Sequence, residues 1–367
     1  MHEPGANQVE FAAGSLPSAW LGRSWFISGV CGTIGRRLLE RVARLEPKQV
    51  IGLDNNESEL FYLCDQYRTS PVLKFYTADL RDRREVESRI AGCEIVLHAA
   101  AVKHVLLCEE SPFAAIHANI LGTQNIIDAA LNTGVERLLL TSSDKAVNPT
   151  NVMGTSKLMA ERLVSAANAR SPHGDQVFSS TRFGNVLGSR GSVIPVFARQ
   201  VRGGGPVTVT DPDMTRFIMT LDEAVGLVMN SLFLARGGEV FVTKMPVMRI
   251  GDLAEVMIEE LAARYGHKPS SIAIEIIGKR PGEKTYEELM NDEEIQRSIE
   301  LPKYFVIRPA ILPSFRSIDY VYPEMNSSPS PRWPYNSKTA KSMSKSELRA
   351  YLLGHPELLA ESECRAI

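Results

Sequence analysis

Short apolar runs alternate with stretches of helical periodicity along the first half of the chain. The apolar runs have the length and β-branched content of buried strands, and they are SWFISG, QVIGLD, LKFYTAD, CEIVLHAA and RLLLTSS. Apolar residues recur at three- and four-residue spacing between them, in TIGRRLLERVARL, ESELFYLCDQY, RREVESRI and PFAAIHANILGTQNIIDAAL, and again in NVMGTSKLMAERLVSAANA. Because parallel strands need crossover connections, this alternation predicts an α/β fold with a Rossmann-type, doubly wound parallel sheet.

The alternation weakens after VFSSTRFGN, at about residue 185, where LGSRGSVIP and RGGGPVTVTDPD have the Gly and Pro content of ligand-capping loops. Helices are predicted at TLDEAVGLVMNSLFLA and RIGDLAEVMIEELAARYG, with a strand at EVFVTK between them, and Ser344 with Glu347 forms a capping box. We expect four parts: a flexible lead (1–22), a dinucleotide-binding domain (23–185), a smaller α/β substrate-binding region (186–335) with some segments returning to the main sheet, and a helical tail (336–367).

Charge and cysteine content exclude several classes of protein. The 41 basic and 43 acidic side chains leave a net charge of -2, which favours neither nucleic acid nor an anionic membrane as a partner. The five cysteines are odd in number, scattered and without a C-x-x-C pair, so we expect no disulfide framework and no metal site. No apolar run reaches the roughly 20 residues of a membrane span, and the first residues lack a signal-peptide pattern. We therefore expect a cytoplasmic protein that does not bind a membrane.

Three glycines follow the first predicted strand and open the first predicted helix. Gly29, Gly32 and Gly35 in SGVCGTIG have the spacing G-x-x-G-x-x-G. Such glycines let the backbone approach a pyrophosphate while the helix N-terminus offers unpaired N–H groups and a positive dipole end. A purely structural glycine turn is the alternative.

An acidic residue, Asp54, ends the second predicted strand. A carboxylate there accepts hydrogen bonds from the adenosine ribose hydroxyls, which favours NAD over NADP; the alternative is that Asp54 caps the next helix. Asp79 and Leu80 follow the third strand, where the adenine would lie, and the small residues Ala99 and Ala100 leave room for the dinucleotide backbone.

The stretch TSSDKAVNPTNVMGTSK carries the candidate chemistry. Ser143, Asp144 and Lys145 stand at the C-terminal end of a predicted strand, where open parallel sheets place their ligands. An acid beside an amine at this place can act on neighbouring atoms of one bound molecule; a solvated salt bridge is the alternative. Met153 and Lys157 lie one helical turn apart on one face. A solvent-exposed lysine on the helix surface is the alternative for Lys157.

Six motifs in order, between about residue 25 and residue 290, carry a family resemblance: KHV at 103–105, NILGTQN, SSDKAVNPTNVMGTSK, TRFGNVLGSRGSVIP, DMTRFIMT and RPGEKTYEEL. Together they resemble the extended short-chain dehydrogenase/reductase family, specifically its UDP-N-acetylglucosamine 4,6-dehydratases. Met153 replaces the catalytic tyrosine of that family, as in its configuration-retaining branch, which supplies bacillosamine and legionaminic acid synthesis. Several retaining relatives carry an N-terminal membrane region, and this chain resembles the soluble form.

The resemblance implies a reaction in which bound NAD is regenerated at each cycle. Oxidation at sugar C4 acidifies the C5 hydrogen, Lys145 removes that hydrogen as the base, Asp144 protonates the departing C6 hydroxyl, and the hydride returns to C6. We expect burial and the nicotinamide ring to lower the pKa of Lys145, and Asp144 to be protonated. Ser143 with a water, or Asp144 itself, replaces the tyrosine at the 4-hydroxyl, while Met153 fills the volume of the phenol.

The resemblance also assigns binding residues. The expected cofactor contacts are Gly29, Cys31, Gly32, Thr33, Ile34, Gly35, Asp54, Asn55, Asp79, Leu80, Ala99, Ala100, Lys103, Asn119, Thr141, Ser142, Lys157 and Val186. The expected substrate contacts are Lys103, His104, Asn185, Arg190, Ser192, Val193, Arg280 and Glu283, with weaker support for Thr215 and Arg216.

Three other functions stay open at this point. A GDP-N-acetylglucosamine 4,6-dehydratase and a UDP-N-acetylglucosamine 5,6-dehydratase use the same scaffold. A non-catalytic NAD-binding sensor or scaffold would explain the missing tyrosine, although a binder has no use for the adjacent acid and amine. A 4-epimerase is less favoured because it normally uses that tyrosine. The resemblance further implies assembly as a homo-oligomer.

Overall fold

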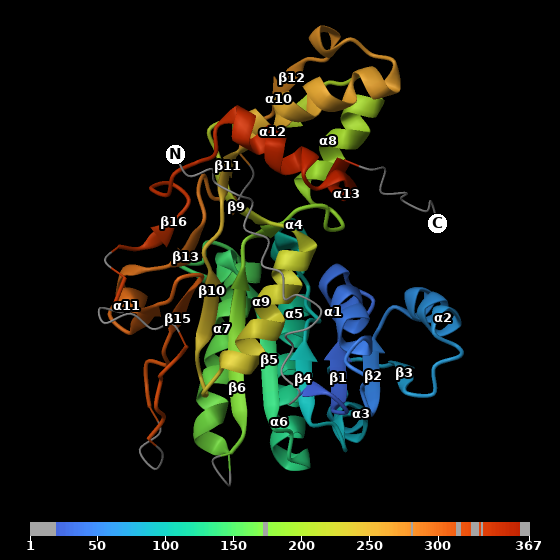
Figure 1. Ribbon diagram of the computed structural model, residues 1–367, viewed down its shortest axis with the longest axis vertical. Helices are drawn as coiled ribbons and strands as arrows, with labels where there is room; N and C mark the ends of the chain where they lie inside the picture. Colours follow the sequence, from blue (N-terminus) through green and yellow to red (C-terminus); the bar gives the residue numbers. More distant parts are fainter. Residues whose placement is uncertain are drawn as a thin grey trace.

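A nine-stranded sheet forms the centre of the computed structural model, which describes residues 20–171, 175–279, 282–312, 317–323, 330–331 and 333–359 (Figure 1). The strand order is β14-β15-β10-β6-β5-β4-β1-β2-β3. The mutually parallel strands are β1 (Ser24–Ser28), β2 (Gln49–Asp54), β3 (Leu73–Thr77), β4 (Ile95–His98), β5 (Arg137–Ser143), β6 (Val177–Phe183) and β10 (Val240–Thr243). At one edge, β15 (Tyr304–Ile307) pairs antiparallel with β10, and β14 (Ser298–Glu300) pairs antiparallel with β15. The predicted Rossmann-type fold is confirmed.

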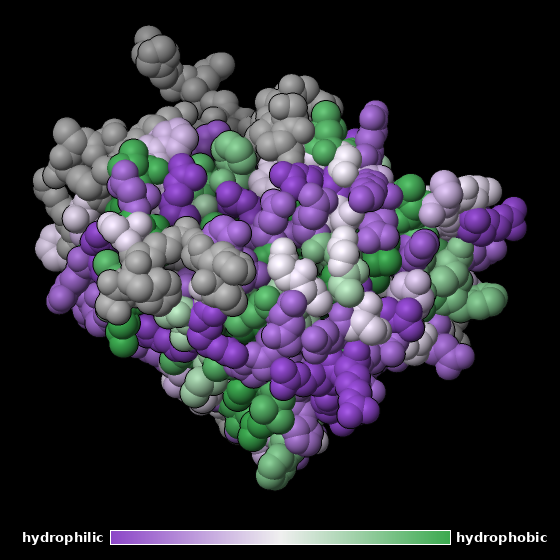
Figure 2. All heavy atoms as spheres, turned by 90° about the horizontal axis from the view of Figure 1, so that it is seen from below, coloured by the Kyte–Doolittle hydropathy of each residue, from purple (hydrophilic) through white to green (hydrophobic). Residues whose placement is uncertain are grey.

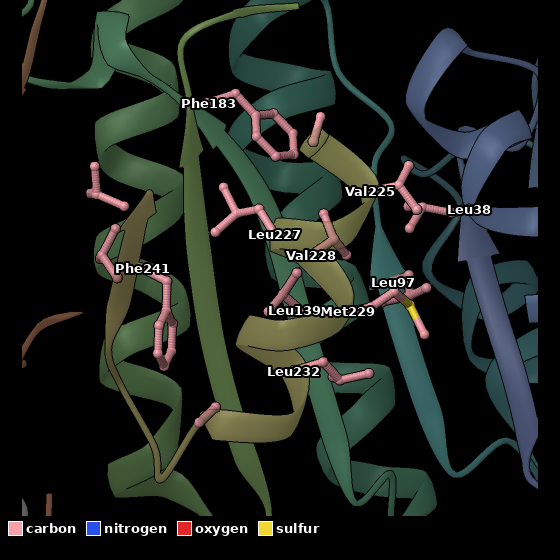
Figure 3. Close-up of a cluster of buried hydrophobic side chains, with 14 of the residues drawn as sticks. Leu38, Leu97, Leu139, Phe183, Val225, Leu227, Val228, Met229, Leu232 and Phe241 are labelled. Atoms are coloured by element: carbon pink, nitrogen blue, oxygen red, sulfur yellow. The ribbon is translucent and has the colours of Figure 1, made fainter. Parts of the chain in front are cut away.

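Helices cover both faces of this sheet because its strands are apolar on both sides. On β1, Trp25 and Ile27 pack with α1 (Thr33–Ala43), α2 (Glu57–Gln66) and α9 (Leu221–Leu234), whereas Phe26 packs with α3 (Arg83–Ile90), α6 (Gly122–Thr133) and α7 (Val152–Ala167). Figure 3 shows α9 directing Val225, Val228, Met229 and Leu232 onto the sheet, where Leu97 and Leu139 lie. Such near-continuous apolar strands are typical of a parallel sheet with two covered faces.

The segment between β4 and β5 is not the single helix that its periodicity predicts. It consists of α4 (Val105–Glu110), α5 (Pro112–Ala115), a π-helical segment η2 (Ile116–Leu121) and α6. Pro112 starts a new helix after Ser111 because its ring cannot continue the preceding one. The π-helical turns place Asn119 inside the protein.

The second half of the chain builds a lobe above the carboxyl ends of the strands, at the top of Figure 1. Its apolar core joins α8 (Val193–Arg202), α10 (Ile250–Leu261), α12 (Lys345–Leu353), α13 (Pro356–Leu359), β8 (Val207–Val209) and β12 (Ile274–Ile276). The expectation of loops in LGSRGSVIP and RGGGPVTVTDPD was partly wrong, because α8 begins at Val193 and β8 lies in the second stretch. Pro195 fits the first turn of α8, where an N–H has no helical partner to lose. The predicted capping box of Ser344 and Glu347 is confirmed at the start of α12.

Smaller elements connect the lobe to the sheet. A three-stranded sheet contains β7 (Asn185–Val186), β9 (Thr215–Met219) and β11 (Val247–Arg249), and a two-stranded one contains β13 (Glu288–Met290) and β16 (Tyr335–Asn336). The short helices are η3 (Asp144–Ala146), η4 (Asn168–Arg170), η5 (Ala263–Tyr265), η6 (Pro269–Ser271) and α11 (Asp292–Ile295). Trp20, in the segment expected to be a loose lead, is buried against Trp25.

The face of the protein seen from below the sheet has a mixed polarity (Figure 2). Figure 2, which views the molecule from below the sheet, shows hydrophilic side chains interspersed with separate apolar groups. Within the described ranges, no helix has both the length and the apolar character that crossing a membrane requires. The same residues hold no group of three or more His, Cys, Asp and Glu side chains arranged for a metal ion.

Candidate active site

The glycine loop after β1 has the geometry of a dinucleotide cradle. Gly29 has a φ of +69°, and a Cβ there would lie 2.6 Å from the Ala100 backbone. A Cβ on Gly35 would lie 2.0 Å from the Gly29 carbonyl oxygen, so α1 can approach the loop only through glycine. Gly32 is the exposed N-cap of α1 and offers no side chain to its first N–H groups, which stay available to an anion. These residues fit a pyrophosphate.

Asp54 supports this loop. One carboxylate oxygen accepts the Cys31 N–H at 2.9 Å, and the other accepts the Asn56 N–H at 3.0 Å. Asn56, rather than Asp54, caps α2 with its side chain, so the helix-capping alternative for Asp54 is wrong. Asp54 is partly exposed beside the loop, where it fixes the backbone that would face a ribose. Thr33 and Ile34 open α1, and Asn55 is exposed next to Asp54.

Buried hydrogen bonds between polar side chains fix the end of β4. His98 lies 2.6 Å from the Ser28 hydroxyl and 2.9 Å from the Thr123 hydroxyl, linking β1 to α6. Burial and the nearby Lys157 ammonium lower the pKa of His98 to about 3, so the ring stays neutral. The next residues, Ala99 and Ala100, are partly exposed, as a cofactor channel would require.

Two other predicted cofactor residues are occupied by contacts within the protein. The Asn119 amide bonds to both the N–H and the carbonyl of Val102 and donates to the Ser156 hydroxyl. Asp79 accepts three hydrogen bonds from Arg81, which lower the pKa of its carboxyl. Asn119 therefore shapes the loop after β4, and Leu80 is buried against Gly122 of α6.

The Asp144–Lys145 pair lies inside the protein, not at its surface. Lys145 Nζ donates to Asp144 Oδ1 at 3.0 Å, and Asp144 also accepts the Ser143 hydroxyl at 2.8 Å. The Asp144 side chain is 1% exposed and that of Lys145 is 24% exposed. Asp144 Oδ2 is buried and has no hydrogen-bond partner among the described residues. The alternative of a solvated surface salt bridge is therefore wrong.

A second carboxylate, which the sequence did not single out, also meets the lysine. Glu287, from the segment before β13, places Oε1 3.3 Å from Lys145 Nζ and 3.7 Å from Arg216 Nε. Burial alone would lower the pKa of Lys145, but Asp144 and Glu287 together raise it above its ordinary value. The expectation of a lowered lysine pKa is thus wrong for the protein alone, because two acids surround the amine.

Lys157 and Met153 face the same region from α7. Lys157 is buried and donates to the Thr141 carbonyl at 3.0 Å, and burial lowers its pKa to about 8. Met153 packs against Cys108 and Ala115 in a small apolar cluster. Helix α7 approaches η3 closely, since a Cβ on Gly154 would lie 2.2 Å from the Lys145 carbonyl oxygen. The alternative of a solvent-exposed Lys157 is wrong.

The loop before α8 reaches across to the cofactor half. Arg190 pairs with Glu59 of α2 at 3.1 Å, and Glu59 also pairs with Arg36 of α1 at 3.2 Å. Lys103 donates to the Arg190 carbonyl, and burial with the Arg190 charge lowers the pKa of Lys103. We call Arg190, Glu59 and Arg36 the clasp. As placed, Arg190 contacts the cofactor half, although it was predicted to bind substrate.

The remaining predicted substrate residues surround the lobe side of the site. His104, the N-cap of α4, packs against Gly191. Ser192 is the N-cap residue of α8, but its buried hydroxyl makes no capping hydrogen bond and has no partner in the described ranges. Arg216 ion-pairs with Glu283 at 3.8 Å.

Asn185 and Val186 form β7, Val193 begins α8, and Thr215 bonds to Ser337. Ser142 follows Thr141 on β5, and its buried hydroxyl has no hydrogen-bond partner among the residues that the structure describes. Arg280 lies outside those residues.

The chain matches the family described as "Polysaccharide biosynthesis protein" over residues 25–309. It is 45% identical to the "Uncharacterized membrane protein MJ1061" of Methanocaldococcus jannaschii, with 89% of this chain and 94% of that protein aligned. It is 39% identical to the "Probable polysaccharide biosynthesis protein EpsC" of Bacillus subtilis, covering 82% of this chain but only 50% of EpsC. A "UDP-glucose 4-epimerase" of Rickettsia akari is 36% identical over 78% of this chain and 82% of its own.

Solved structures agree with this placement. The structure of Pen from Bacillus thuringiensis superposes with a TM-score of 0.83 at 39% identity, covering 91% of this chain and 98% of that one. The dTDP-glucose 4,6-dehydratase DesIV of Streptomyces venezuelae shares the fold at a TM-score of 0.61 and 21% identity, over 71% and 86% of the two chains. The chain therefore belongs to the polysaccharide biosynthesis protein family, built on the fold that nucleotide-sugar epimerases and dehydratases share.

Proposed function

We propose that the protein is an NAD-dependent nucleotide-sugar 4,6-dehydratase that converts UDP-N-acetylglucosamine to its 4-keto-6-deoxy product with retention at C5. The observation that carries the proposal is the Asp144–Lys145 pair, which is buried at the carboxyl end of β5 with one Asp144 oxygen unpaired among the described residues. A buried acid beside an amine suits the removal of one proton and the delivery of another on adjacent carbons.

The cofactor assignment rests on the glycine loop and Asp54. Gly29, Gly32 and Gly35 would hold the pyrophosphate, Asp54 would meet the adenosine ribose, and Lys157 would meet the nicotinamide ribose. Bound NAD would supply the hydride acceptor for oxidation at sugar C4 and, once reduced, the hydride donor for C6. DesIV and a Thermus thermophilus UDP-glucose 4-epimerase are both described with NAD bound.

The proton of the 4-hydroxyl needs an acceptor because Met153 replaces the tyrosine. Ser143 already donates its proton to Asp144 Oδ1, so its hydroxyl is engaged. Asp144 Oδ2 is buried, has no hydrogen-bond partner among the described residues and is therefore free to accept the 4-hydroxyl proton. We assign Asp144 both tasks: it takes the 4-hydroxyl proton during oxidation and then passes this proton to the C6 hydroxyl as it leaves. Lys145 removes the C5 proton.

Epimerisation at C4 is the second candidate, because relatives named UDP-glucose 4-epimerase are 36–37% identical to this chain. An epimerase returns the hydride to C4 and leaves C5 and C6 untouched. It therefore has no task for an amine at C5, whereas Lys145 is held in the site by two carboxylates. This contact favours dehydration.

Incubation with UDP-N-acetylglucosamine in heavy water separates the candidates. Dehydration predicts a new 6-methyl signal and deuterium at C5 in the NMR spectrum, with no added NAD. Accumulation of the C4 epimer without exchange at C5 would support the epimerase, and an unchanged sugar would support a binding role. GDP-N-acetylglucosamine, tested in parallel, identifies the nucleotide, and a 5,6-unsaturated product would indicate the 5,6-dehydratase.

A further inference from the structure

Lys145 is protonated where it lies, and a base must first lose its proton. Its ammonium sits 3.0 Å from Asp144 Oδ1 and 3.3 Å from Glu287 Oε1, and these two acids raise its pKa above the ordinary value against the effect of burial. Removal of the C5 hydrogen requires the neutral amine. The structure must therefore provide an acceptor for the Lys145 proton within reach.

Among the described neighbours of Lys145, one proton acceptor remains. Asp144, under the proposed function on which this inference rests, is occupied by the proton that moves from the 4-hydroxyl to the C6 hydroxyl. Arg216, 3.7 Å from Glu287, is a permanent cation and accepts no proton. Glu287 is 2% exposed, and its Oε2 has no hydrogen-bond partner in the part of the chain that the structure describes.

The backbone holds Glu287 in place independently of its carboxylate. Its N–H donates to the Ser337 hydroxyl and its carbonyl accepts the Ser337 N–H, next to the pairing of β13 with β16. Burial raises the pKa of Glu287, and the Asp144 charge adds to that rise, while Lys145 and Arg216 oppose it. A carboxylate so placed accepts a proton more readily than an ordinary glutamate.

We propose that Glu287 is a positioning residue that accepts the proton of Lys145 and so converts the ammonium into the base that acts at C5. The Nζ–H bond breaks and an Oε1–H bond forms. The neutral amine then takes the C5 proton, and the electron pair of the broken C5–H bond forms the enolate. The enolate expels the C6 hydroxyl, which leaves as water with the proton from Asp144. After hydride return, Lys145 gives a proton back to C5 and recovers its original proton from Glu287, so the cycle needs no further reactant.

Replacement of the carboxyl tests this transfer. In Glu287→Gln, Lys145 can lose its proton only to solvent. We expect kcat at pH 7 to fall at least tenfold, on the order of a general acid–base contribution, and then to rise about tenfold per pH unit because the neutral fraction does. The wild type, whose proton moves internally, should be nearly flat between about pH 7 and pH 9. Glu287→Asp should restore the flat profile.

Glu288→Gln is the matched control, because Glu288 is the adjacent residue and bonds to Asn148 and Lys284 instead. It should keep both the rate and the pH profile. A flat, nearly unchanged Glu287→Gln enzyme would overturn the proposal. So would a uniform loss of rate that Glu287→Asp does not rescue, since that indicates a structural role.

An activity-independent measurement separates this inference from the proposed function. Competitive acetylation of Lys145, read by mass spectrometry against pH, reports its pKa in the protein without substrate. Glu287→Gln removes one of the two charges that raise this pKa, so the Lys145 pKa should fall, while Glu288→Gln should leave it unchanged. An unchanged Lys145 pKa in Glu287→Gln overturns the inference even if dehydration is confirmed. If the wild type does not dehydrate the sugar, the proposed function fails instead.

Discussion

Two buried clusters in this protein each place one cation between two carboxylates, and they differ in what is left unpaired. On β6, Arg182 donates to all four carboxylate oxygens of Glu161 and Glu294 and to the Leu289 carbonyl. At the end of β5, Lys145 contacts one oxygen each of Asp144 and Glu287, and the second oxygen of each is buried without a described partner.

This difference distinguishes a cluster that stabilises the fold from a cluster that is suited to a reaction. A buried ion pair is tolerated when every polar atom is satisfied, because desolvation is then offset by hydrogen bonds. The Arg182 cluster meets that condition and ties α7, β6 and α11 together. The Lys145 cluster does not meet it, and unpaired buried acceptors of this kind are typical of sites that a substrate completes. The predictions below test this contrast.

The largest expected effect is on turnover. Asp144→Asn combined with Lys145→Met removes the acid and the base of the unsatisfied cluster. General acid–base groups each contribute about 10²–10⁴-fold to rate, so turnover should fall below detection. Cofactor content, measured by absorbance after denaturation, should stay near that of the wild type because the glycine loop and Lys157 are untouched. A double variant with substantial dehydratase activity would contradict the site assignment.

The satisfied cluster should instead control stability. Arg182→Met leaves Glu161 and Glu294 buried without a cation, which typically costs about 3–5 kcal/mol. Urea unfolding followed by circular dichroism measures this loss. Arg170→Met is the control, because Arg170 pairs with Asp128 while 52% exposed and should change stability by less than about 1 kcal/mol. Equal effects of the two substitutions would remove the contrast.

The lowered pKa of Lys157 predicts how the stability of the fold changes with pH. Its pKa is lowered to about 8 by burial, whereas the unfolded chain keeps the ordinary value of 10.5. The unfolded state thus binds more protons between these values, and stability rises with pH across that interval. Relative to Lys157→Met, the wild type without cofactor should gain about 2–3 kcal/mol between pH 7 and pH 10. Parallel pH curves for the two proteins would refute the lowered pKa.

The clasp should give the smallest effect. Glu59 pairs with both Arg190 and Arg36, and Arg190 is 60% exposed, so the pairs are screened by solvent. Glu59→Gln should speed NADH release by no more than about fivefold, as expected for a contribution of up to about 1 kcal/mol. Stopped-flow fluorescence of bound NADH measures the release. Glu57→Gln, an exposed change on the same helix, should release NADH at the wild-type rate.

Periodicity predicted the alternating strands and helices of the sheet because local apolar patterns reflect burial on two faces. It missed α8 because Gly188, Gly191 and Pro195 dominate the composition around its start, although they occupy its approach and first turn. It also missed β14 and β15, which are short and form a local hairpin that joins the sheet only through the pairing of β15 with β10, far away in the chain.

The sequence predicted the site residues that belong to a local motif. It did not predict a contact between two segments that are distant in the chain. The glycine loop and the Asp144–Lys145 pair follow from local spacing. Glu287 stands next to Glu288, and nothing in EKTYEEL distinguishes the buried acid from its neighbour. The pKa of Lys145 is raised by Asp144 and by Glu287, which lies 142 positions away, so the expectation from burial and the nicotinamide ring predicted the wrong direction.

The hydride path tests the central claim most directly. UDP-N-acetylglucosamine carrying deuterium at C4 should be incubated with the protein as purified, and the position of the label followed by NMR and mass spectrometry. A closed dehydratase cycle predicts that the deuterium moves to the product methyl group, giving CH₂D at C6 without added NAD. Deuterium retained at C4 of an epimer, or lost to solvent, would contradict it.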